Sequence, residues 1–439
     1  MNAFELVMWL SGYSIRDAKK NLSELSLLSS HDLSTMHAKQ ARDIAAYHWS
    51  FNSMYREKVG SKFPERWEDL PILKKADYQA DWARIISRPF QHQSLYTAST
   101  SGSSGQPFKF AKDKKAHALT WALIDDRYGW HGLSLSSRQA RFYGIPLEPV
   151  DRFKETLKDR IMNRERFPVF DLSDRQLEIF LKRLRNGRFD YVYGYANSLL
   201  SFADFLQRKG LVLVQEAPSL DLCITTSEMC TPPDRLLLER SFGLKVVDEY
   251  GTSEVGLLAF EDSEQHRILS EELLYIEIVD DSGRPVPDGS EGSIVVTDLT
   301  NRAMPFVRYA VGDIGIISAR RHKSRRVLEA LVGRRSDTIL LPSGKRSPGL
   351  TFYYVAKTVL QSTGVIQEFI VRQPSLNKFV FEMVTKRPLD ENESSLLRDK
   401  VATYLEPNLE IELKYVSSIP RTALGKHQHF FSELKHDKG

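Results

Sequence analysis

Residues 96–107 read YTASTSGSSGQP and mark a change in the pattern of the chain. Helix-forming residues dominate before Tyr96, whereas short β-rich runs alternate with helical patterns after it. The small residues of this stretch let backbone amides approach an anion closely, and the hydroxyls at 99–104 can donate to phosphate oxygens. The stretch therefore predicts a phosphate-binding loop at the start of an α/β region, although a flexible glycine–serine linker has the same composition.

Four β-rich runs, each followed by a helical pattern, come next along the chain. Such alternation is typical of a sheet whose strands are connected by helical crossovers. The fold class is therefore α/β, with a large N-terminal domain. The expected strands are 108–111, 140–145, 191–195 and 220–226, and the expected helices are 113–130, 150–164, 197–209 and 232–242.

Beyond Lys245 the strands follow one another more closely, at 273–279, 293–297, 306–310 and 314–318. The turn signal at 280–283 indicates a hairpin, so this part is expected to form a small antiparallel β-barrel or sheet. The last segment has its own mixture of strands and helices and is long enough for a separate α+β domain. The predicted domains are 1–335 and 338–439.

The length and composition of the chain argue against several classes of protein. The 439 residues correspond to about three domain equivalents, which excludes a peptide hormone. Lys and Arg number 61 against 57 Asp and Glu, and the small net charge of +4 argues against a dedicated nucleic-acid-binding protein. The two cysteines, Cys223 and Cys230, are too few for a disulfide framework and fit the reducing cytoplasm. No apolar run is long enough to cross a bilayer, and 4–10 is expected to be a packed helix.

Four further stretches carry side chains that suit nucleotide chemistry. The strand 246–254 ends in a glycine turn beside a carboxylate, which could hold Mg²⁺ through oxygen or form an ordinary surface turn. The stretches 308–313 and 333–337 each combine Arg with Asp, and an Asp at a turn can accept from both hydroxyls of a ribose. The stretch 420–426 places a lysine in a glycine-containing loop. Each of these signals is weak alone.

The order and spacing of these five stretches resemble the core motifs of the acyl-adenylate-forming enzymes. Within that superfamily the chain looks most like the phenylacetate-CoA ligase family, including its relatives encoded with capsule polysaccharide genes. The segments YVYGYA at 191–196 and TTSEM at 225–229 support this closer match. The resemblance extends from about residue 64 to the C-terminus.

The resemblance implies that the chain binds ATP with Mg²⁺. Glu254 would hold the Mg²⁺, and Lys426 would bridge the attacking carboxylate and the α-phosphate. The other implied nucleotide-binding residues are Thr100, Ser101, Gly102, Ser103, Ser104 and Gly105 at the β- and γ-phosphates, Ser227, Glu228, Met229, Asp248, Glu249 and Tyr250 around adenine, Gly251, Thr252 and Ser253 in the turn that follows, and Asp313 and Arg334 at the ribose.

The same resemblance implies a mobile C-terminal lid hinged at 336–337, near Asp337. The lid would present Lys426 for the first half-reaction and a different face for transfer of the acyl group. The acyl pocket would be lined by aromatic segments of two strands, which could instead be aromatic core. The residues concerned are Tyr143, Gly144, Tyr193 and Tyr195.

The expected reaction converts ATP and a carboxylic acid into an acyl-adenylate and pyrophosphate, and then passes the acyl group to CoA. The alternative acceptor is a sugar amine or hydroxyl, or a carrier, in capsule or surface polysaccharide biosynthesis, because the segment 340–348 differs from the common ligase form. A scaffold that binds a nucleotide or glycan without catalysis is the alternative of another class. Neither a nucleic-acid partner nor a membrane span is expected, and the oligomeric state stays open.

Some members of the family carry a Cys/His zinc site after the acidic motif. Here the segment 256–272 contains one histidine, His266, and no cysteine. The sequence therefore predicts that this chain lacks zinc.

Overall fold

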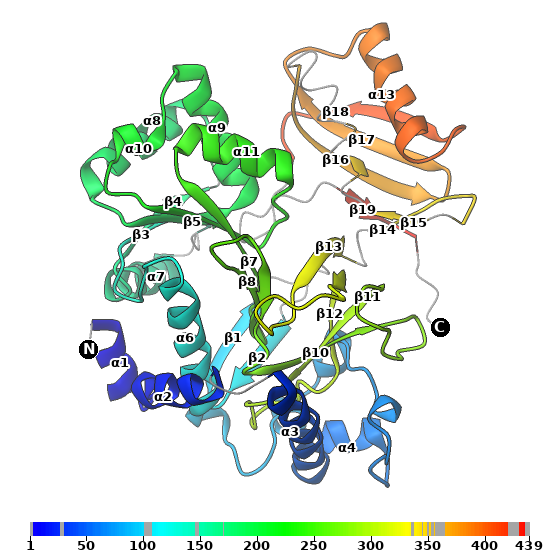
Figure 1. Cartoon of the computed structure of the whole chain (residues 1–439). Helices are drawn as coiled ribbons and strands as arrows, with labels where there is room; N and C mark the ends of the chain where they lie inside the picture. The colour runs from blue at the N-terminus through cyan, green and yellow to red at the C-terminus, as the bar shows by residue number, and fades with distance from the viewer. Residues whose placement is uncertain are drawn as a thin grey trace. The chain divides into compact units, whose positions relative to one another are not determined.

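The computed structural model describes residues 3–26, 30–100, 108–144, 149–169, 171–334, 338–344, 346–348, 351–352, 355, 365–419 and 430–434. The chain divides into two compact units (Figure 1). Residues 1–311 and 315–330 form the first unit, and residues 312–314 and 331–439 form the second. The first unit thus ends at Ala330, a few residues before the predicted hinge.

The N-terminal part of the first unit is mostly helical. Helix α1 is buried through Phe4 alone, and Trp9 and Leu10 are exposed, so this helix packs less completely than the sequence predicts. The elements are α1 (Ala3–Leu10), α2 (Ile15–Ser26), α3 (Ser30–Phe51), α4 (Ser53–Val59), α5 (Trp82–Ile85), short 3₁₀ turns at Trp67–Asp69, Lys75–Tyr78 and His92–Ser94, and an antiparallel hairpin of β1 (Tyr96–Thr100) and β2 (Phe108–Lys112).

A seven-stranded sheet forms the centre of the first unit. Its strand order is β4-β3-β5-β6-β7-β8-β9. The first five strands in this order are parallel, and β8 and β9 are antiparallel to their neighbours. The strands are β3 (Gln139–Tyr143), β4 (Arg164–Pro168), β5 (Tyr191–Tyr195), β6 (Leu222–Thr226), β7 (Lys245–Thr252), β8 (Gly256–Glu261) and β9 (Arg267–Leu269).

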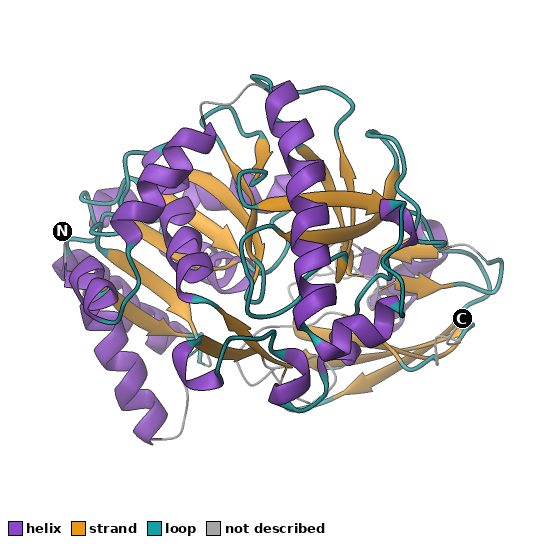
Figure 2. Cartoon of the chain, turned by 90° about the horizontal axis from the view of Figure 1, so that it is seen from below, coloured by secondary structure: helices purple, strands orange, loops and turns teal. Residues whose placement is uncertain are grey.

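Helical crossovers connect the parallel strands and cover both faces of the sheet, as Figures 1 and 2 show. Figure 1 places α8, α9 and α11 on one side and α6 and α7 on the other. The predicted α/β alternation is therefore confirmed. The helices are α6 (Lys114–Gly129), α7 (Pro149–Ile161), α8 (Asp174–Gly187), α9 (Ala196–Lys209), α10 (Leu213–Glu216) and α11 (Pro232–Phe242).

Helix α11 shows how local sequence sets the bounds of a crossover. Thr231 caps its N-terminus, with its hydroxyl accepting from the Asp234 backbone N–H, and Pro232 occupies the first turn, where the missing N–H is harmless. Gly243 ends the helix in the left-handed conformation, at a φ of 65°, which glycine adopts without steric cost. The sequence pattern therefore predicts the observed range 232–242.

The face of the sheet beneath α8, α9 and α11 is an aromatic and aliphatic core. Phe142, Phe167 and Phe180 are fully buried there, and the Phe142 and Phe167 rings stack with centroids 5.0 Å apart. Gly194 is required beside them, because a Cβ at that position would lie 2.6 Å from the Phe142 Cβ. Strand β5 can therefore lie against β3 only with glycine there.

A four-stranded sheet, ordered β10-β11-β12-β13, follows the central sheet in sequence. The predicted turn at 280–283 is present, with the Gly283 N–H donating to the Asp280 carbonyl. The two strands expected at 306–310 and 314–318 are instead one strand, β12, because the intervening Gly312 continues the strand at a positive φ. The strands are β10 (Leu274–Val279), β11 (Glu291–Asp298), β12 (Tyr309–Ile317) and β13 (Leu328–Arg334).

The second unit is an α+β arrangement with its own core. A four-stranded sheet, ordered β18-β17-β16-β19, buries Phe379 and Phe381 against Leu397 and Val401 of its helix. The elements are β14 (Thr338–Leu340), β15 (Arg346–Pro348), β16 (Ile366–Ser375), β17 (Lys378–Thr385), α13 (Glu391–Tyr404), β18 (Glu410–Tyr415) and β19 (Phe430–Ser432). In the described part of the chain, no helix combines the length and the apolar character needed to span a membrane.

Candidate active site

The carboxyl ends of the parallel strands form the edge where most predicted site residues meet. Strand β3 lies between β4 and β5. The chain passes from β3 to β4 on one side and then crosses back to form β5 on the other side, so the strand order reverses at β3. In open α/β sheets, ligands bind outside the carboxyl ends of the strands at such a switch point. The predicted residues at this edge are Tyr143 and Gly144 at β3, Tyr193 and Tyr195 in β5, Ser227, Glu228 and Met229 after β6, and Asp248, Glu249 and Tyr250 in β7.

Glu249 accepts three side-chain hydrogen bonds at this edge. Its Oε1 accepts from the Tyr193 hydroxyl at 2.7 Å and the Thr226 hydroxyl at 3.1 Å, and its Oε2 accepts from the Tyr128 hydroxyl at 3.0 Å. Burial raises the pKa of Glu249, and the three hydroxyl donors oppose that rise. The structure thus joins Tyr193 and Glu249, which the sequence predicts for different parts of the site.

A cationic side chain lies among the predicted acyl-pocket tyrosines. The Arg141 guanidinium lies 4.3 Å from the Tyr143 ring centroid and 4.6 Å from that of Tyr193, within the range of a cation–π contact. The Tyr143 and Tyr195 rings are also in contact, with centroids 4.0 Å apart. The sequence reasoning missed Arg141, although its position two residues before Tyr143 places both side chains on one face of β3.

The turn after β6 has an unusual backbone. Ser227 has a φ of 65°, which a non-glycine residue adopts uncommonly and which occurs disproportionately at functional sites. The adjacent Glu228 accepts from the Asn197 backbone N–H at 2.9 Å, at the first turn of α9. The positive end of the helix dipole stabilises a carboxylate at that position.

Asp248 and Glu249 point to opposite faces of the sheet because side chains alternate along a strand. The Asp248 carboxylate accepts from Thr225 at 3.0 Å and lies 3.2 Å from the Arg267 guanidinium. Burial raises the pKa of Asp248 to about 6. The two residues predicted to flank one adenine are therefore not equivalent, and only Glu249 lies on the face that carries the tyrosines.

Glu254 is held in the turn between β7 and β8. Its Oε1 accepts from the Tyr309 hydroxyl at 2.8 Å, and the side chain is buried. Gly251 permits the close approach of the two strands, because a Cβ there would lie 2.7 Å from the Gly256 carbonyl oxygen. The predicted carboxylate is thus fixed by a strand pair and by a tyrosine that the sequence reasoning did not single out.

A buried lysine also lies close to this carboxylate. Lys112 is 2% exposed, and its ammonium donates to the Thr120 hydroxyl at 3.1 Å. Burial lowers the pKa of Lys112, and the negative charges of Asp298 and Glu254 oppose that effect. Lys112 and Glu254 therefore interact electrostatically, and the place of Lys112 at the end of a β-strand gave no sequence signal for this.

Several predicted residues cannot be placed against this geometry. The pairing of Thr100 with Phe108 holds the ends of the predicted phosphate loop together. Asp313 lies on β12, and Arg334 ends β13. The remaining loop residues, Ser101, Gly102, Ser103, Ser104 and Gly105, and also Asp337 and Lys426, lie outside the described residues.

Comparison of the sequence with curated proteins finds relatives of one kind, the phenylacetate-coenzyme A ligases. The chain is 25% identical to the phenylacetate-coenzyme A ligase of Thermus thermophilus, over 92% of this chain and 97% of that protein. It is 30% identical to the enzyme of that name from Aromatoleum evansii and 24% identical to that from Pseudomonas putida. The latter two matches span 39% and 60% of this chain, and 40% and 62% of those proteins. No known family profile matches the chain.

Solved structures share the fold. A 2-hydroxyisobutyryl-CoA ligase in the postadenylation state, in complex with an acyl-AMP, has a TM-score of 0.67 at 15% identity, covering 90% of this chain and 89% of that one. The amide bond synthetase McbA from Marinactinospora thermotolerans has a TM-score of 0.53 at 18% identity, covering 76% and 67%. The chain is therefore a homologue of the phenylacetate-coenzyme A ligases and has the fold of the acyl-adenylate-forming ligases.

Proposed function

We propose that this chain activates a carboxylic acid with ATP, as an acyl-adenylate, and then transfers the acyl group to the thiol of CoA. The observation that carries the proposal is the cluster at the carboxyl edge, where Tyr193, Thr226 and Tyr128 converge on Glu249. The near full-length match to a phenylacetate-coenzyme A ligase supports the same chemistry. The cytoplasm is the compartment we expect, because it supplies both ATP and CoA.

In the first half-reaction the substrate carboxylate attacks the α-phosphorus of ATP. The bond from that phosphorus to the bridging oxygen breaks, and pyrophosphate leaves. Negative charge accumulates at phosphorus, so fixed positive charge lowers the barrier. We assign this role to Lys426, with Asp337 near the hinge of the lid that presents it.

The nucleotide would bind along the carboxyl edge. The loop Thr100–Gly105 would receive the β- and γ-phosphates, and Ser227–Met229 with Glu249 and Tyr250 would border the base. Asp313 and Arg334 would contact the ribose. Gly251, Thr252 and Ser253 would shape the turn that leads to Glu254.

The environment of Glu254 fits a magnesium ligand. Its carboxylate is buried and held by Tyr309, and oxygen donors are the ones that Mg²⁺ prefers. The ion would supply charge neutralisation for the phosphates of ATP. Tyr309 would keep the carboxylate oriented toward them.

The acid would enter near Tyr143, Gly144, Tyr193 and Tyr195, where Arg141 supplies a positive charge. Aromatic faces and a cation suit an acid with an aromatic or polar acyl group. For the acceptor, the amide bond synthetase with this fold supports an amine as the second candidate. A sugar amine in surface polysaccharide synthesis would be such an acceptor.

The test is ATP–pyrophosphate exchange by the full chain across pools of aryl, fatty, hydroxy and amino acids, without CoA. We expect magnesium-dependent exchange in at least one pool, and Lys426→Ala should slow it by on the order of 10² to 10³. The matched control is Lys62→Ala, a side chain 84% exposed, which should leave the rate unchanged.

Adding CoA or an amine to the active pool then identifies the acceptor by the thioester or amide formed. ATP binding without exchange in any pool would support a non-catalytic scaffold. Unchanged exchange in Lys426→Ala would contradict the role assigned to that lysine.

A further inference from the structure

Large apolar side chains are exposed on two neighbouring helices of the first unit, α1 and α7. The two helices contact each other, and Figure 1 shows α7 beside the N-terminal helices. Leu10 is 70% exposed and Phe153 is 71% exposed. A group of such side chains on one surface marks an interaction site. The members of this apolar patch are Leu6, Val7, Trp9 and Leu10 on α1, and Phe153 and Leu157 on α7.

Packing fixes the inner face of α1 and thereby sets its outer face. Phe4 is buried, and its ring meets that of Trp121 on α6 edge-on, with centroids 4.7 Å apart. Successive residues of a helix are about 100° apart around the axis. Leu6, Trp9 and Leu10 therefore lie on the side of α1 away from Phe4.

Helix α2 secures α1 against the body of the unit. The Lys19 ammonium lies 2.6 Å from a Glu5 carboxylate oxygen on α1 and 2.8 Å from an Asp125 oxygen on α6. Ile15 and Leu22 of α2 are buried. The exposed face of α1 is thus presented on a supported helix.

Helix α7 places cations on both flanks of its apolar stripe. Phe153 and Leu157 are one turn apart and share one side of the helix. Lys154 and Lys158 follow them by one residue each, on one flank, and Arg160 lies on the other flank. All five side chains are exposed.

The acids of α7 occupy a different side of the helix and are paired within the fold. Arg166 lies 2.9 Å from a Glu155 oxygen and 3.0 Å from an Asp159 oxygen, and Asp159 is buried. Lys158 also pairs with Glu155 at 2.7 Å, but its side chain stays 61% exposed. The border of the apolar stripe on α7 is therefore positive.

An apolar face with a positive border fits an anionic lipid surface. Apolar side chains can enter the boundary between headgroups and acyl chains, while lysines attract the anionic headgroups. The Trp9 ring suits the headgroup level, where tryptophan is enriched. A second copy of this chain fits less well, because two-fold pairing places a patch against itself and would bring the cations of α7 toward one another.

We propose that the apolar patch, together with Lys154, Lys158 and Arg160, docks this chain on the surface of an anionic lipid bilayer. Helices α1 and α7 would lie in the plane of the interface, with Trp9, Leu10 and Phe153 inserted among the headgroups. The sequence predicts a packed helix at 4–10, and only the structure shows that its outer face is left exposed. The proposal goes beyond the proposed function and does not depend on adenylation.

The experiment is sedimentation of the full chain with vesicles of phosphatidylcholine and phosphatidylglycerol in equal parts. We expect binding at low salt and little binding to vesicles of phosphatidylcholine alone. Trp9→Glu combined with Leu10→Glu should lower the ratio of bound to free protein by roughly tenfold or more. The matched control Leu236→Glu, at an exposed apolar residue of α11, should bind as the wild type does.

The positive border is tested separately. Lys154→Ala and Arg160→Ala should each weaken binding to the anionic vesicles by about fivefold, and a high salt concentration should release the wild type. The control Lys62→Ala removes an exposed cation that lies outside α1 and α7 and should leave binding unchanged.

Two further measurements keep the result interpretable. Trp9→Phe should still bind, but brominated lipid should quench its fluorescence less than that of the wild type, because Trp9 is one of six tryptophans and the one placed in the interface. Thermal unfolding should show that the charged variants fold. Phe153→Glu, on the other helix, should weaken binding even if the α1 variant fails to fold.

Absence of binding to the anionic vesicles, or equal binding by the folded Trp9→Glu, Leu10→Glu variant, would overturn the proposal. A wild-type dimer that this variant converts to a monomer, without vesicle binding, would also overturn it and assign the patch to a second copy. Pyrophosphate exchange in the absence of vesicles should be unchanged in these variants. Failure of the docking proposal is therefore distinguishable from failure of the proposed function.

Discussion

The two faces of the central sheet carry different chemistry. On the face beneath α8, α9 and α11, Phe142 and Phe167 stack among fully buried apolar residues. On the face toward α6, Arg141 lies against two tyrosines and Glu249 accepts three hydrogen bonds. Because neighbouring residues of β3 alternate between these faces, one strand serves both purposes.

The difference shows where this fold can vary its chemistry without losing its core. Close-packed aromatic side chains tolerate little change in volume, so the apolar face stabilises the sheet. The polar face buries charge that is compensated by hydroxyls and aromatic rings, so its residues can be selected for binding. Four substitutions test this division, from the largest expected effect to the smallest.

Removing a ring from the apolar face should have the largest effect. Phe142→Ala should lower the free energy of unfolding by about 3–5 kcal/mol, because it leaves a cavity among Phe167 and Phe180. Urea unfolding followed by fluorescence would measure this loss. The control Phe153→Ala removes a ring that is 71% exposed and should change stability by less than about 0.5 kcal/mol. Equal losses in the two variants would contradict the division.

Asp248, at the carboxyl edge of the apolar face, should make stability depend on pH. Burial raises its pKa to about 6, so the folded chain holds this proton more tightly than the unfolded chain, whose pKa is 3.8. The resulting stabilisation is complete below pH 3.8 and is lost as the pH rises through 6.

Asp248→Asn should remove this dependence, so between those pH values the variant should gain up to about 3 kcal/mol relative to the wild type. Parallel urea titrations across that window would measure the difference. If the difference in free energy of unfolding between the two proteins did not change with pH, Arg267 and Thr225 would be keeping this carboxylate ionised in the folded chain.

On the polar face, Glu249→Gln should lower the free energy of unfolding by about 1–3 kcal/mol. The amide NH₂ would face a hydroxyl donor, so part of the hydrogen-bond network would be lost. The matched variant Tyr193→Phe removes one donor only and should lose about 0.5–1.5 kcal/mol. If Glu249→Gln changed exchange activity no more than Tyr193→Phe does, Glu249 would be a structural acid only.

An exposed ion pair on the covering helices should have the smallest effect. Arg208 and Asp174 join α9 to α8, and both side chains are more than half exposed. Asp174→Asn should therefore change the free energy of unfolding by no more than about 0.2–1 kcal/mol, because solvent and salt screen the pair. A larger loss in the same urea assay would show that the helices, rather than the aromatic core, hold this face together.

Local sequence was sufficient for the elements whose signals are local. The strand 191–195 and the helix 232–242 match the structure because alternation, a capping Thr231 and a terminating Gly243 act within a few residues. The strand pair expected at 306–310 and 314–318 is wrong, because Gly312, which lies between the two predicted strands, does not break the chain into a turn and is accommodated within β12. Glycine permits both outcomes, and only the neighbouring strands select one.

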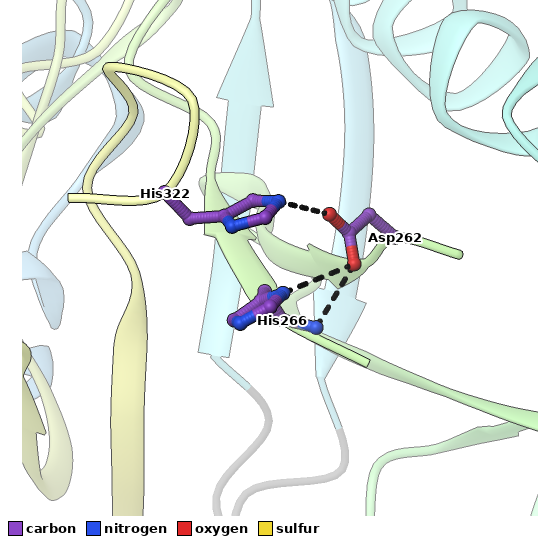
Figure 3. Close-up of side chains that lie close together, drawn as sticks. All are labelled: Asp262, His266 and His322. Carbon is purple, nitrogen blue, oxygen red and sulfur yellow. Dashed lines mark hydrogen bonds and ion pairs between the residues drawn. The ribbon is translucent and has the colours of Figure 1, made fainter. Parts of the chain in front are cut away.

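The sequence by itself determined the α/β alternation, the family resemblance and the positions of Tyr193, Glu249 and Glu254 in their motifs. The tertiary structure alone decided that Arg141 contacts Tyr193 of the neighbouring strand, that Tyr128 and Tyr193 meet at Glu249, and that His322 meets Asp262 and His266 (Figure 3). The physical reason is the distance along the sequence over which each kind of interaction acts. Periodicity and capping act between neighbours in sequence, whereas strand order and loop pairing bring together residues that no local pattern connects.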